Sequence, residues 1–266
     1  RGILQWLGGI GIVVVAMVFL PELRVGGMQI FKSESFDTFG KILPRAGQIA
    51  TQISVIYLWL TLACMLSYLA LGMSTFDATV HALTTVSTGG FSNYDASFST
   101  FSGPAEYVAV IFMILAALPF VRYVQLINGN PVALHRDPQV RGFFMTMTFL
   151  VVIVFFVLRS GTTYESERVL REALFNITSI ISGTGYASAD YMQWGSFAVA
   201  LFFFIGLIGG CAGSTTCSIK IFRYQLLFAS IRAQLRRIRS PHGVFTPRYD
   251  GRPVGADVLS SVMSFF

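Results

Sequence analysis

The sequence predicts an all-α polytopic membrane protein built from repeated units of helix, pore helix, filter loop and helix. Of its 266 residues, 54% are hydrophobic and only 12% are charged, whereas soluble domains carry about 25% charged residues. Two short apolar segments each run into a stretch of glycine and hydroxyl residues, and longer apolar segments flank them. The net charge of +6 does not indicate a nucleic-acid partner, because eight of the 19 Lys and Arg residues lie in 220–252 beside a hydrophobic segment, as in cytoplasmic membrane flanks.

Six apolar segments are candidate membrane spans. Several are shorter than the roughly 20 residues that a helix needs to cross a bilayer, so we expect their ends to extend into the flanking residues. The first would close an earlier unit whose beginning is not in the chain. The segments are Ile3–Leu20, Ile53–Gly72, Tyr107–Val121, Phe143–Leu158, Phe197–Cys211 and a weaker one, Ile219–Ile231, which carries Lys220 and Arg223.

Two half-length apolar segments, Phe76–Val86 and Val169–Ile181, lie between pairs of these spans. Their length predicts re-entrant rather than spanning helices. Each leads into a glycine-bearing loop, and such backbone is tolerated at membrane depth only where it is buried in protein or lines a wet path. Either loop alone would favour an ordinary helix cap. The two align at a period of about 95 residues, Gly90 against Gly185, and this register favours an ion pore.

The distribution of Lys and Arg predicts the orientation. Loop 22–52, loop 122–141 and the tail 220–252 together hold 15 of the 19 positive residues. Positive residues favour the cytoplasm. If each half-length helix returns to the side from which it enters, all three regions face inward and both glycine loops open outward.

The glycine loops suit a cation filter made of backbone carbonyls. Such oxygens replace the hydration shell of a dehydrated ion, and glycine permits the conformations that direct successive carbonyls toward one axis. No acidic residue lies within either loop, which favours K⁺ over Ca²⁺. The predicted filter residues are Val86, Ser87, Thr88, Gly89, Gly90, Ile181, Ser182, Gly183, Thr184 and Gly185, with K⁺ expected at Thr88, Gly89, Gly90, Gly183, Thr184 and Gly185.

A third segment of small residues interrupts the last strong span. Its consecutive glycine and hydroxyl residues make a poor straight helix. It reads either as a helix-packing face or, as we favour, as an unwound loop that gates the conduction path. The predicted gate residues are Gly209, Gly210, Cys211, Ala212, Gly213, Ser214, Thr215 and Thr216.

Four stretches in collinear order resemble the Trk/Ktr/HKT superfamily of K⁺ transporters, and its bacterial TrkH/TrkG branch in particular. They are Gln5–Ile12, Thr85–Ser92, Ser182–Ser188 and Gly209–Thr216. The resemblance implies four pore units around a pseudo-fourfold axis in the bacterial cytoplasmic (inner) membrane. It also implies a homodimer in contact with membrane lipid, and a cytoplasmic regulatory ring of TrkA type. NAD or ATP would belong to that ring, so the chain itself would hold no cofactor beyond the transported K⁺.

The predicted domains follow the repeat. Residues 1–52 hold the closing helix of a first unit and a cytoplasmic loop, 53–141 the second unit and 142–240 the third unit with the gating loop. Residues 241–266 would link to a fourth unit.

K⁺ uptake is the predicted function. A polytopic membrane enzyme is the first alternative, although Asp77, His81 and Glu172 lack catalytic partners at useful spacing. A non-conducting assembly subunit is the second. Coupling of uptake to H⁺ or Na⁺ stays open.

Overall fold

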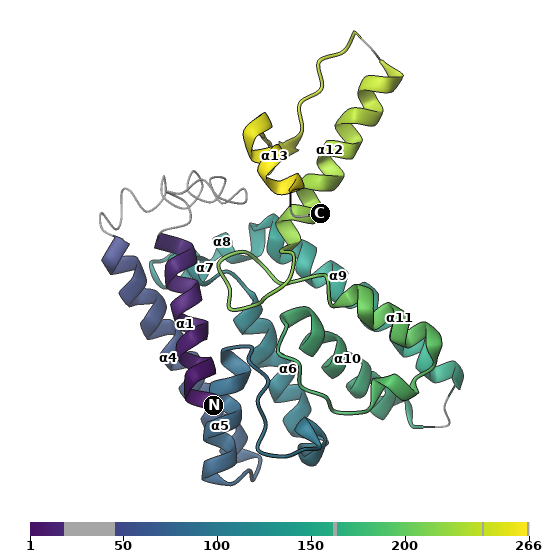
Figure 1. The fold of residues 1–266 in the computed structure, drawn as a ribbon. Helices are drawn as coiled ribbons and strands as arrows, with labels where there is room; N and C mark the ends of the chain where they lie inside the picture. Colours follow the sequence, from purple (N-terminus) through teal and green to yellow (C-terminus); the bar gives the residue numbers. More distant parts are fainter. Residues whose placement is uncertain (19–45, 162–163, 241, 265) are drawn as a thin grey trace.

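The computed structural model describes residues 1–18, 46–161, 164–240, 242–264 and 266, so the predicted cytoplasmic loop 22–52 lies largely outside the described residues. The described part is mostly helical, as predicted (Figure 1). Its helices are α1 (Gly2–Val18), α4 (Ala46–Ala70), α5 (Thr75–Val86), α6 (Pro104–Ala117), α7 (Phe120–Ile127), α8 (Val132–Arg136), α9 (Pro138–Gly161), α10 (Ser166–Ser182), α11 (Ser196–Ile205), α12 (Ile221–Arg239) and α13 (Ala256–Met263), with 3-10 turns η1 (Ser97–Phe101) and η2 (Tyr191–Gln193). The strands β1 (Arg248–Tyr249) and β2 (Arg252–Pro253) form an antiparallel hairpin.

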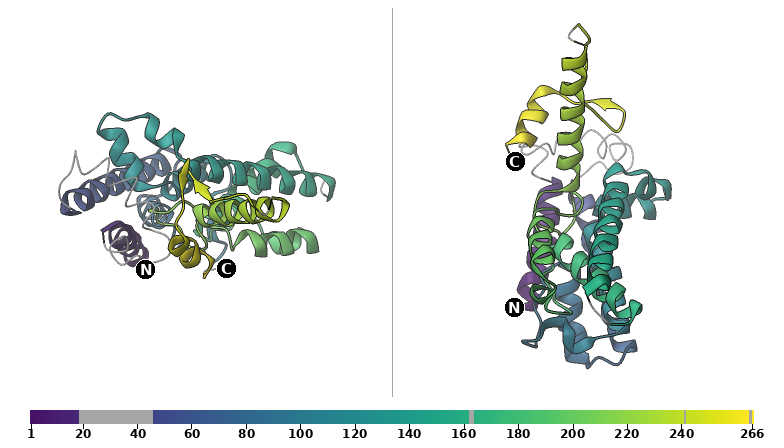
Figure 2. Two further views of the ribbon diagram at one scale, coloured as in Figure 1. Left: turned by 90° about the horizontal axis from the view of Figure 1, so that it is seen from above. Right: turned by 90° about the vertical axis from the view of Figure 1, so that its right-hand side faces the viewer.

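The helices form a bundle around the two short helices α5 and α10. Helix α5 packs against α1, α4 and α6, and α10 packs against α6, α9 and α11. Helices α7 and α8 lie at one end of the bundle, and α12 and α13 continue beyond that same end (Figures 1 and 2). The basic segments 122–141 and 220–252 therefore share one end of the molecule, in agreement with the orientation that the charge distribution predicts.

Two of the described helices, α4 and α9, are long and apolar enough to cross a membrane. They contain the predicted spans Ile53–Gly72 and Phe143–Leu158, apart from the last two residues of the first, and both begin earlier than predicted. Their large apolar side chains are partly turned outward, among them Trp59 and Phe149. Such exposure is expected of a surface that faces lipid, since lipid tails are as apolar as these side chains.

The predicted span Tyr107–Val121 is not one straight helix, although α6 and α7 together are long and apolar enough to form a broken span. Helix α6 ends at Ala117, and α7 leaves it at an angle of 88°. The cause lies in Leu118 and Pro119. A residue before proline is disfavoured in helical conformation, and Leu118 is extended, with ψ 158°. Pro119 has no N–H with which to continue the helical hydrogen bonds.

The predicted span Phe197–Cys211 also ends early. Helix α11 stops at Ile205, and its ten residues cover about 15 Å, half of a hydrocarbon core. The glycines from Gly206 onward account for the stop, since glycine is among the poorest helix formers. The weaker span Ile219–Ile231 becomes α12, which extends eight residues further, to Arg239, and has three arginines in its last turn. Positive charge at that end favours the helix dipole.

The first re-entrant helix matches its prediction closely, since α5 covers Thr75–Val86. The second is longer than the half-length Val169–Ile181, because α10 begins at Ser166 and has 17 residues. Its first turn is charged and was therefore missed by hydropathy. Arg168 in that turn is paired with Glu172 at 2.8 Å.

Candidate ion pathway and intramembrane loop

The first glycine loop folds back on the end of α5. The amide groups of Gly89 and Gly90 both donate to the carbonyl of Thr84, at 2.8 and 3.3 Å. Thr88 has φ 51° and Gly90 has φ 70°, so the chain turns through left-handed conformations twice. Both amides therefore point back to the last turn of α5.

The second glycine loop repeats this arrangement 95 residues later. Gly183 and Gly185 have φ 72° and 82°, and the amide of Gly185 donates to the carbonyl of Ser179 at 3.2 Å. The Ser179 hydroxyl donates to the carbonyl of Tyr186 at 2.7 Å, as the Thr84 hydroxyl donates to that of Phe91 at 2.9 Å. The predicted register thus pairs residues with the same backbone conformation and hydrogen bonds.

The two loops lie side by side. A methyl group added at Gly90 would overlap the carbonyl group of Thr184, only 2.8 Å from its carbonyl carbon. A methyl group at Gly185 would meet nothing within 4 Å. Gly90 therefore allows close backbone contact between the loops, whereas Gly185 borders open space.

Tyr186 joins the second loop to the first re-entrant helix. Its ring is 1% exposed, and its hydroxyl is hydrogen-bonded to the Thr84 hydroxyl and lies 3.3 Å from the carbonyl of His81. The His81 ring is itself fixed by the carbonyl of Asp77 at 2.8 Å and the Ser92 hydroxyl at 3.0 Å. Both ring nitrogens of His81 are therefore held by hydrogen bonds, which gives this residue a structural role in the network.

Gln5 of α1 holds the first loop from the other side. Its Nε2 donates to the carbonyl of Gly89 at 2.8 Å, and its Oε1 accepts from the amide of Phe91 at 3.3 Å. The carbonyl of Gly89 thus accepts a hydrogen bond from the protein, and its role as an ion ligand stays a prediction. Sequence reasoning missed Gln5, although a lone polar residue inside an apolar span is a signal of function.

The other predicted K⁺ positions keep their carbonyls free. Within the part of the chain that the structure describes, no hydrogen bond reaches the carbonyl oxygens of Thr88, Gly90, Gly183, Thr184 or Gly185. Thr88 and Thr184 are buried, Gly90 and Gly183 are half-buried and Gly185 is exposed, and unpaired carbonyls at buried positions are uncommon, since nearly all such groups find a partner. Five of them in two adjacent loops are the oxygen set that a dehydrated cation requires.

The small-residue loop 209–216 is buried throughout and docks on the break between α6 and α7. The amides of Cys211 and Thr215 donate to the carbonyls of Ala117 and Ala116, at 3.0 and 3.3 Å, and the amide of Phe120 donates to the carbonyl of Gly213 at 2.9 Å. A helix end leaves such backbone groups without intrahelical partners. The break at Pro119 therefore supplies the groups that hold the loop.

The same loop contacts the first glycine loop, and Cys217, directly after it, approaches the second. The Thr88 hydroxyl donates to the carbonyl of Thr215 at 3.0 Å, and the Thr215 hydroxyl lies 3.3 Å from the carbonyl of Val86. A methyl group at Gly183 would overlap the sulfur of Cys217. Beyond the loop, the Lys220 ammonium donates to the Thr216 carbonyl and hydroxyl.

Two charged clusters lie at the opposite end of the bundle from α12. Asp77, in the first turn of α5, accepts hydrogen bonds from the side chains of Asn93, Ser74 and Tyr94. That from Asn93 does most to hold the pKa of this carboxyl below its usual value. Glu172 is paired with Arg168 in the second turn of α10 and does not cap that helix.

Arg171 of α10 links two repeats, and sequence reasoning missed it. It is ion-paired with Glu106 of α6, whose side chain is 1% exposed, and with Glu167 at 3.0 Å. Glu106 also accepts from the amide of Gly103 at 2.9 Å. The pair therefore fixes α6 of one repeat to α10 of the next.

These features define a helical membrane protein in which α5 and α10 bring two glycine loops together beside a buried irregular loop. The family model for TrkH, described as a cation transport protein, matches residues 1–266. The chain belongs to the TrkH family of cation transport proteins. This family is one of transport proteins and not of enzymes.

Individual relatives agree with this family. The chain is 42% identical to the Trk system potassium uptake protein TrkI of Halomonas elongata, covering all of this chain and 54% of that protein. It is 34% identical to TrkH of Escherichia coli, covering 56% of it. The crystal structure of the potassium transporter TrkH from Vibrio parahaemolyticus matches 99% of this chain and 55% of its own, with a TM-score of 0.88 at 31% identity. The chain thus spans about half the length of these relatives.

Proposed function

We propose that the protein carries K⁺ into the cell through a path lined by the carbonyls of the two glycine loops. The observation that carries this proposal is the set of five free carbonyls, at Thr88, Gly90, Gly183, Thr184 and Gly185, in two loops of the same local geometry. The relatives named as potassium uptake proteins support K⁺ as the ion. A negative cell interior gives about 2.3 kcal/mol per elementary charge per 100 mV, enough to drive uptake without a coupled ion.

We infer that the loop 209–216 is the gate of this path. It is buried beneath both glycine loops, and hydrogen bonds at its backbone hold it in place rather than apolar packing alone. Such bonds can be exchanged for others when the loop moves. In this state the loop contacts Thr88 and approaches Gly183 through Cys217, so its displacement would clear the space below both.

The whole protein would have further parts. Four pore units would surround one axis, of which 53–141 and 142–240 form two, with 1–52 completing a first unit and 241–266 leading to a fourth. The working form would be a homodimer in the bacterial inner membrane, in contact with a TrkA-type regulatory ring that holds NAD or ATP. The basic end of the molecule, with α12, is the side that such a ring would approach.

A selectivity measurement tests the ion path. Gly185→Ser in the full-length protein places a side chain into open space at φ 82°, and we expect it to lower ⁸⁶Rb⁺ uptake and the preference for K⁺ over Na⁺. Gly129→Ser is the matched control, because Gly129 has φ 90° and equally open surroundings but lies in the turn after α7. An unchanged K⁺ preference in Gly185→Ser would refute the filter assignment.

A growth experiment distinguishes K⁺ uptake from the second alternative, a non-conducting assembly subunit. A K⁺-uptake-deficient bacterium that carries the full-length protein and its regulatory ring should recover growth at low K⁺. A non-conducting assembly subunit would leave growth and ⁸⁶Rb⁺ uptake at the level of the empty host.

A further inference from the structure

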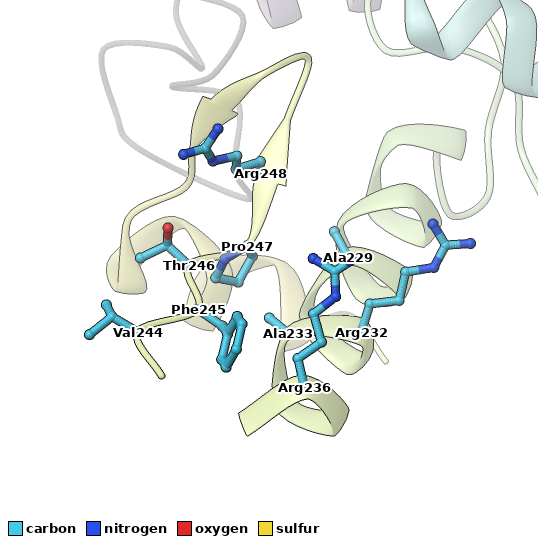
Figure 3. Close-up of a pocket in the computed structure, with 9 residues that line it drawn as sticks. All are labelled: Ala229, Arg232, Ala233, Arg236, Val244, Phe245, Thr246, Pro247 and Arg248. Atoms are coloured by element: carbon cyan, nitrogen blue, oxygen red, sulfur yellow. The ribbon is translucent and has the colours of Figure 1, made fainter. Parts of the chain in front are cut away.

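Two polar features outside the glycine loops differ in their place relative to the ion path. The first is a cavity of about 450 Å³, which Arg232 and Arg236 of α12 line together with Arg248 of the facing segment (Figure 3). It belongs to the part of the molecule that continues beyond the end of the bundle (Figure 1), so its charges lie away from the predicted ion ligands. The second is the side-chain amide of Gln5, which reaches the first glycine loop itself.

Gln5 forms a hydrogen bond with each of two successive peptide groups. Its Nε2 donates to the carbonyl of Gly89 at 2.8 Å, and its Oε1 accepts from the amide of Phe91 at 3.3 Å. These two groups belong to the peptide bonds on either side of Gly90. Because a peptide group is planar, a hydrogen bond at one end of it restricts the rotation of the whole group. One side chain therefore orients both peptide planes that flank Gly90.

The bond to Phe91 determines where the carbonyl of Gly90 points. The described residues contain no cis peptide bond, and the C=O and N–H groups of a trans peptide point in opposite directions. The Phe91 N–H points toward Gln5 of α1, so the Gly90 carbonyl in the same peptide group points away from α1. This carbonyl is one of the five free carbonyls that are the proposed ion ligands.

The glycine at position 89 makes room for the Gln5 side chain. Gly89 does not share the positive φ of Gly90, so its backbone conformation alone does not require glycine. A methyl group added at Gly89 would lie 2.5 to 2.9 Å from the Oε1, Cδ and Cβ atoms of Gln5, closer than such atoms approach in proteins. The counterpart of Gly89 in the second loop is Thr184, whose hydroxyl is hydrogen-bonded to that of Ser182 instead. The small residue at position 89 and the polar residue at position 5 are therefore matched to each other.

Helix α1 is held to α4 by bonds that do not involve the loop. Trp6 Nε1 donates to the hydroxyl of Thr61 at 2.9 Å, and the hydroxyl of Tyr57 donates to the carbonyl of Trp6 at 3.0 Å. Helix α1 also packs against α5. The attachment of α1 to the bundle and the contact of Gln5 with the loop can therefore be tested separately.

We propose that Gln5 is a positioning residue of the ion path, which sets the direction of the Gly90 carbonyl and through it the preference among monovalent cations. The inference rests on the proposed function, because it assigns Gln5 to the path that the glycine loops line. A carbonyl filter discriminates between ions through the number, placement and field of the oxygens around them. A Gly90 carbonyl that is free to rotate would therefore distinguish K⁺ from the smaller Na⁺ less well.

Ion uptake by the full-length protein and its regulatory ring, in the K⁺-uptake-deficient host, tests the proposal. Gln5→Leu fills nearly the same space and makes neither hydrogen bond. We expect the KM for ⁸⁶Rb⁺ to rise and the ratio of ⁸⁶Rb⁺ to ²²Na⁺ uptake to fall, each by roughly fivefold, the factor that corresponds to one hydrogen bond. A variant that merely folds less well would lower the maximal rate and leave KM and the ion ratio unchanged.

Gly89→Ala is a second route to the same loss, because its methyl group displaces the Gln5 amide. It should change KM and the ion ratio as Gln5→Leu does, and the double variant should change them no further than either single variant. Thr61→Val is the matched control, since it removes the bond from Trp6 to α4 but leaves both bonds of Gln5. Its KM and ion ratio should equal those of the parent protein.

The possible results separate this inference from the proposed function. An unchanged KM and ion ratio in Gln5→Leu, beside a changed ratio in Gly185→Ser, would overturn the role of Gln5 and leave the ion path standing. An unchanged ratio in both variants would refute the carbonyl path and the role of Gln5 with it. An equal change in Thr61→Val would assign the effect to the attachment of α1, and additive effects of Gly89→Ala and Gln5→Leu would show that they act separately. Either of these results also overturns the proposal.

Discussion

The paired substitutions Gly90→Ala and Gly185→Ala separate close backbone contact from conformational strain. The two glycines occupy equivalent positions and have nearly the same φ, 70° and 82°. Their surroundings differ, since a methyl group at Gly90 would overlap the Thr184 carbonyl group and one at Gly185 would meet nothing within 4 Å. The same chemical change therefore has two different physical consequences.

The magnitude follows from these surroundings. A non-glycine residue in the left-handed region costs about 1–2 kcal/mol, and both variants bear this cost. Gly90→Ala also forces two backbone segments apart, and overpacking of this kind costs typically 1–3 kcal/mol more. We expect Gly90→Ala to destabilise the protein by about 2–5 kcal/mol and Gly185→Ala by about 1–2 kcal/mol.

Thermal unfolding of the purified full-length proteins, followed in detergent, measures the difference. Both variants should lose ⁸⁶Rb⁺ uptake, Gly90→Ala because the loops separate and Gly185→Ala because its methyl group enters the path. Only Gly90→Ala should show a markedly lower unfolding temperature. Equal unfolding temperatures would refute the close contact between the loops.

Three further predictions concern the contacts around the path. Thr215→Val keeps the side-chain size but removes hydroxyl bonds worth about 1 kcal/mol each, so ⁸⁶Rb⁺ flux into liposomes without nucleotide should rise several-fold; an unchanged flux would argue against a gate. Arg171→Met leaves the buried Glu106 carboxylate unpaired and should cost about 3–5 kcal/mol in thermal unfolding, while adding Glu106→Gln should recover part of this loss, and no recovery would contradict the ion pair. The lowered pKa of Asp77 adds stability at a pH above its unfolded value, which is lost as the pH falls through the folded value; Asn93→Ala should make this acid-induced fall in unfolding temperature shallower.

The re-entrant helix α5 could be predicted from sequence because its signals are local. Its apolar stretch is short, Ser74 precedes it as a cap, and Gly89 and Gly90 follow it. The register of the two glycine loops was likewise visible, since equal spacing of glycine, hydroxyl and aromatic residues leads to equal hydrogen bonds. Helix α10 was less visible, because its first turn contains the charged residues Glu167 and Arg168, which ion pairs stabilise.

The ends of the spans were harder to place. Hydropathy averages over a window, so Leu118 and Pro119 were counted as apolar residues although proline ends a helix. The contacts of Gln5, Tyr186 and Arg171 could not be derived at all. Each joins segments more than 60 residues apart in the chain, and hydropathy or propensity within one segment carries no information about such pairs.

Thr88 has a consequence for how the two halves of the path respond to one another. It is a β-branched residue at φ 51°, where its counterpart in the second loop is Gly183, and such a conformation costs about 1–2 kcal/mol. The bond from its hydroxyl to the Thr215 carbonyl offsets part of that cost. If the loop 209–216 moves away, this hydrogen bond is lost and Thr88 can relax toward negative φ. That relaxation would rotate the Thr88 carbonyl, which is one of the proposed ion ligands. Conductance and ion discrimination would then be thermodynamically linked through one side chain, so that opening the path would also change its preference among ions.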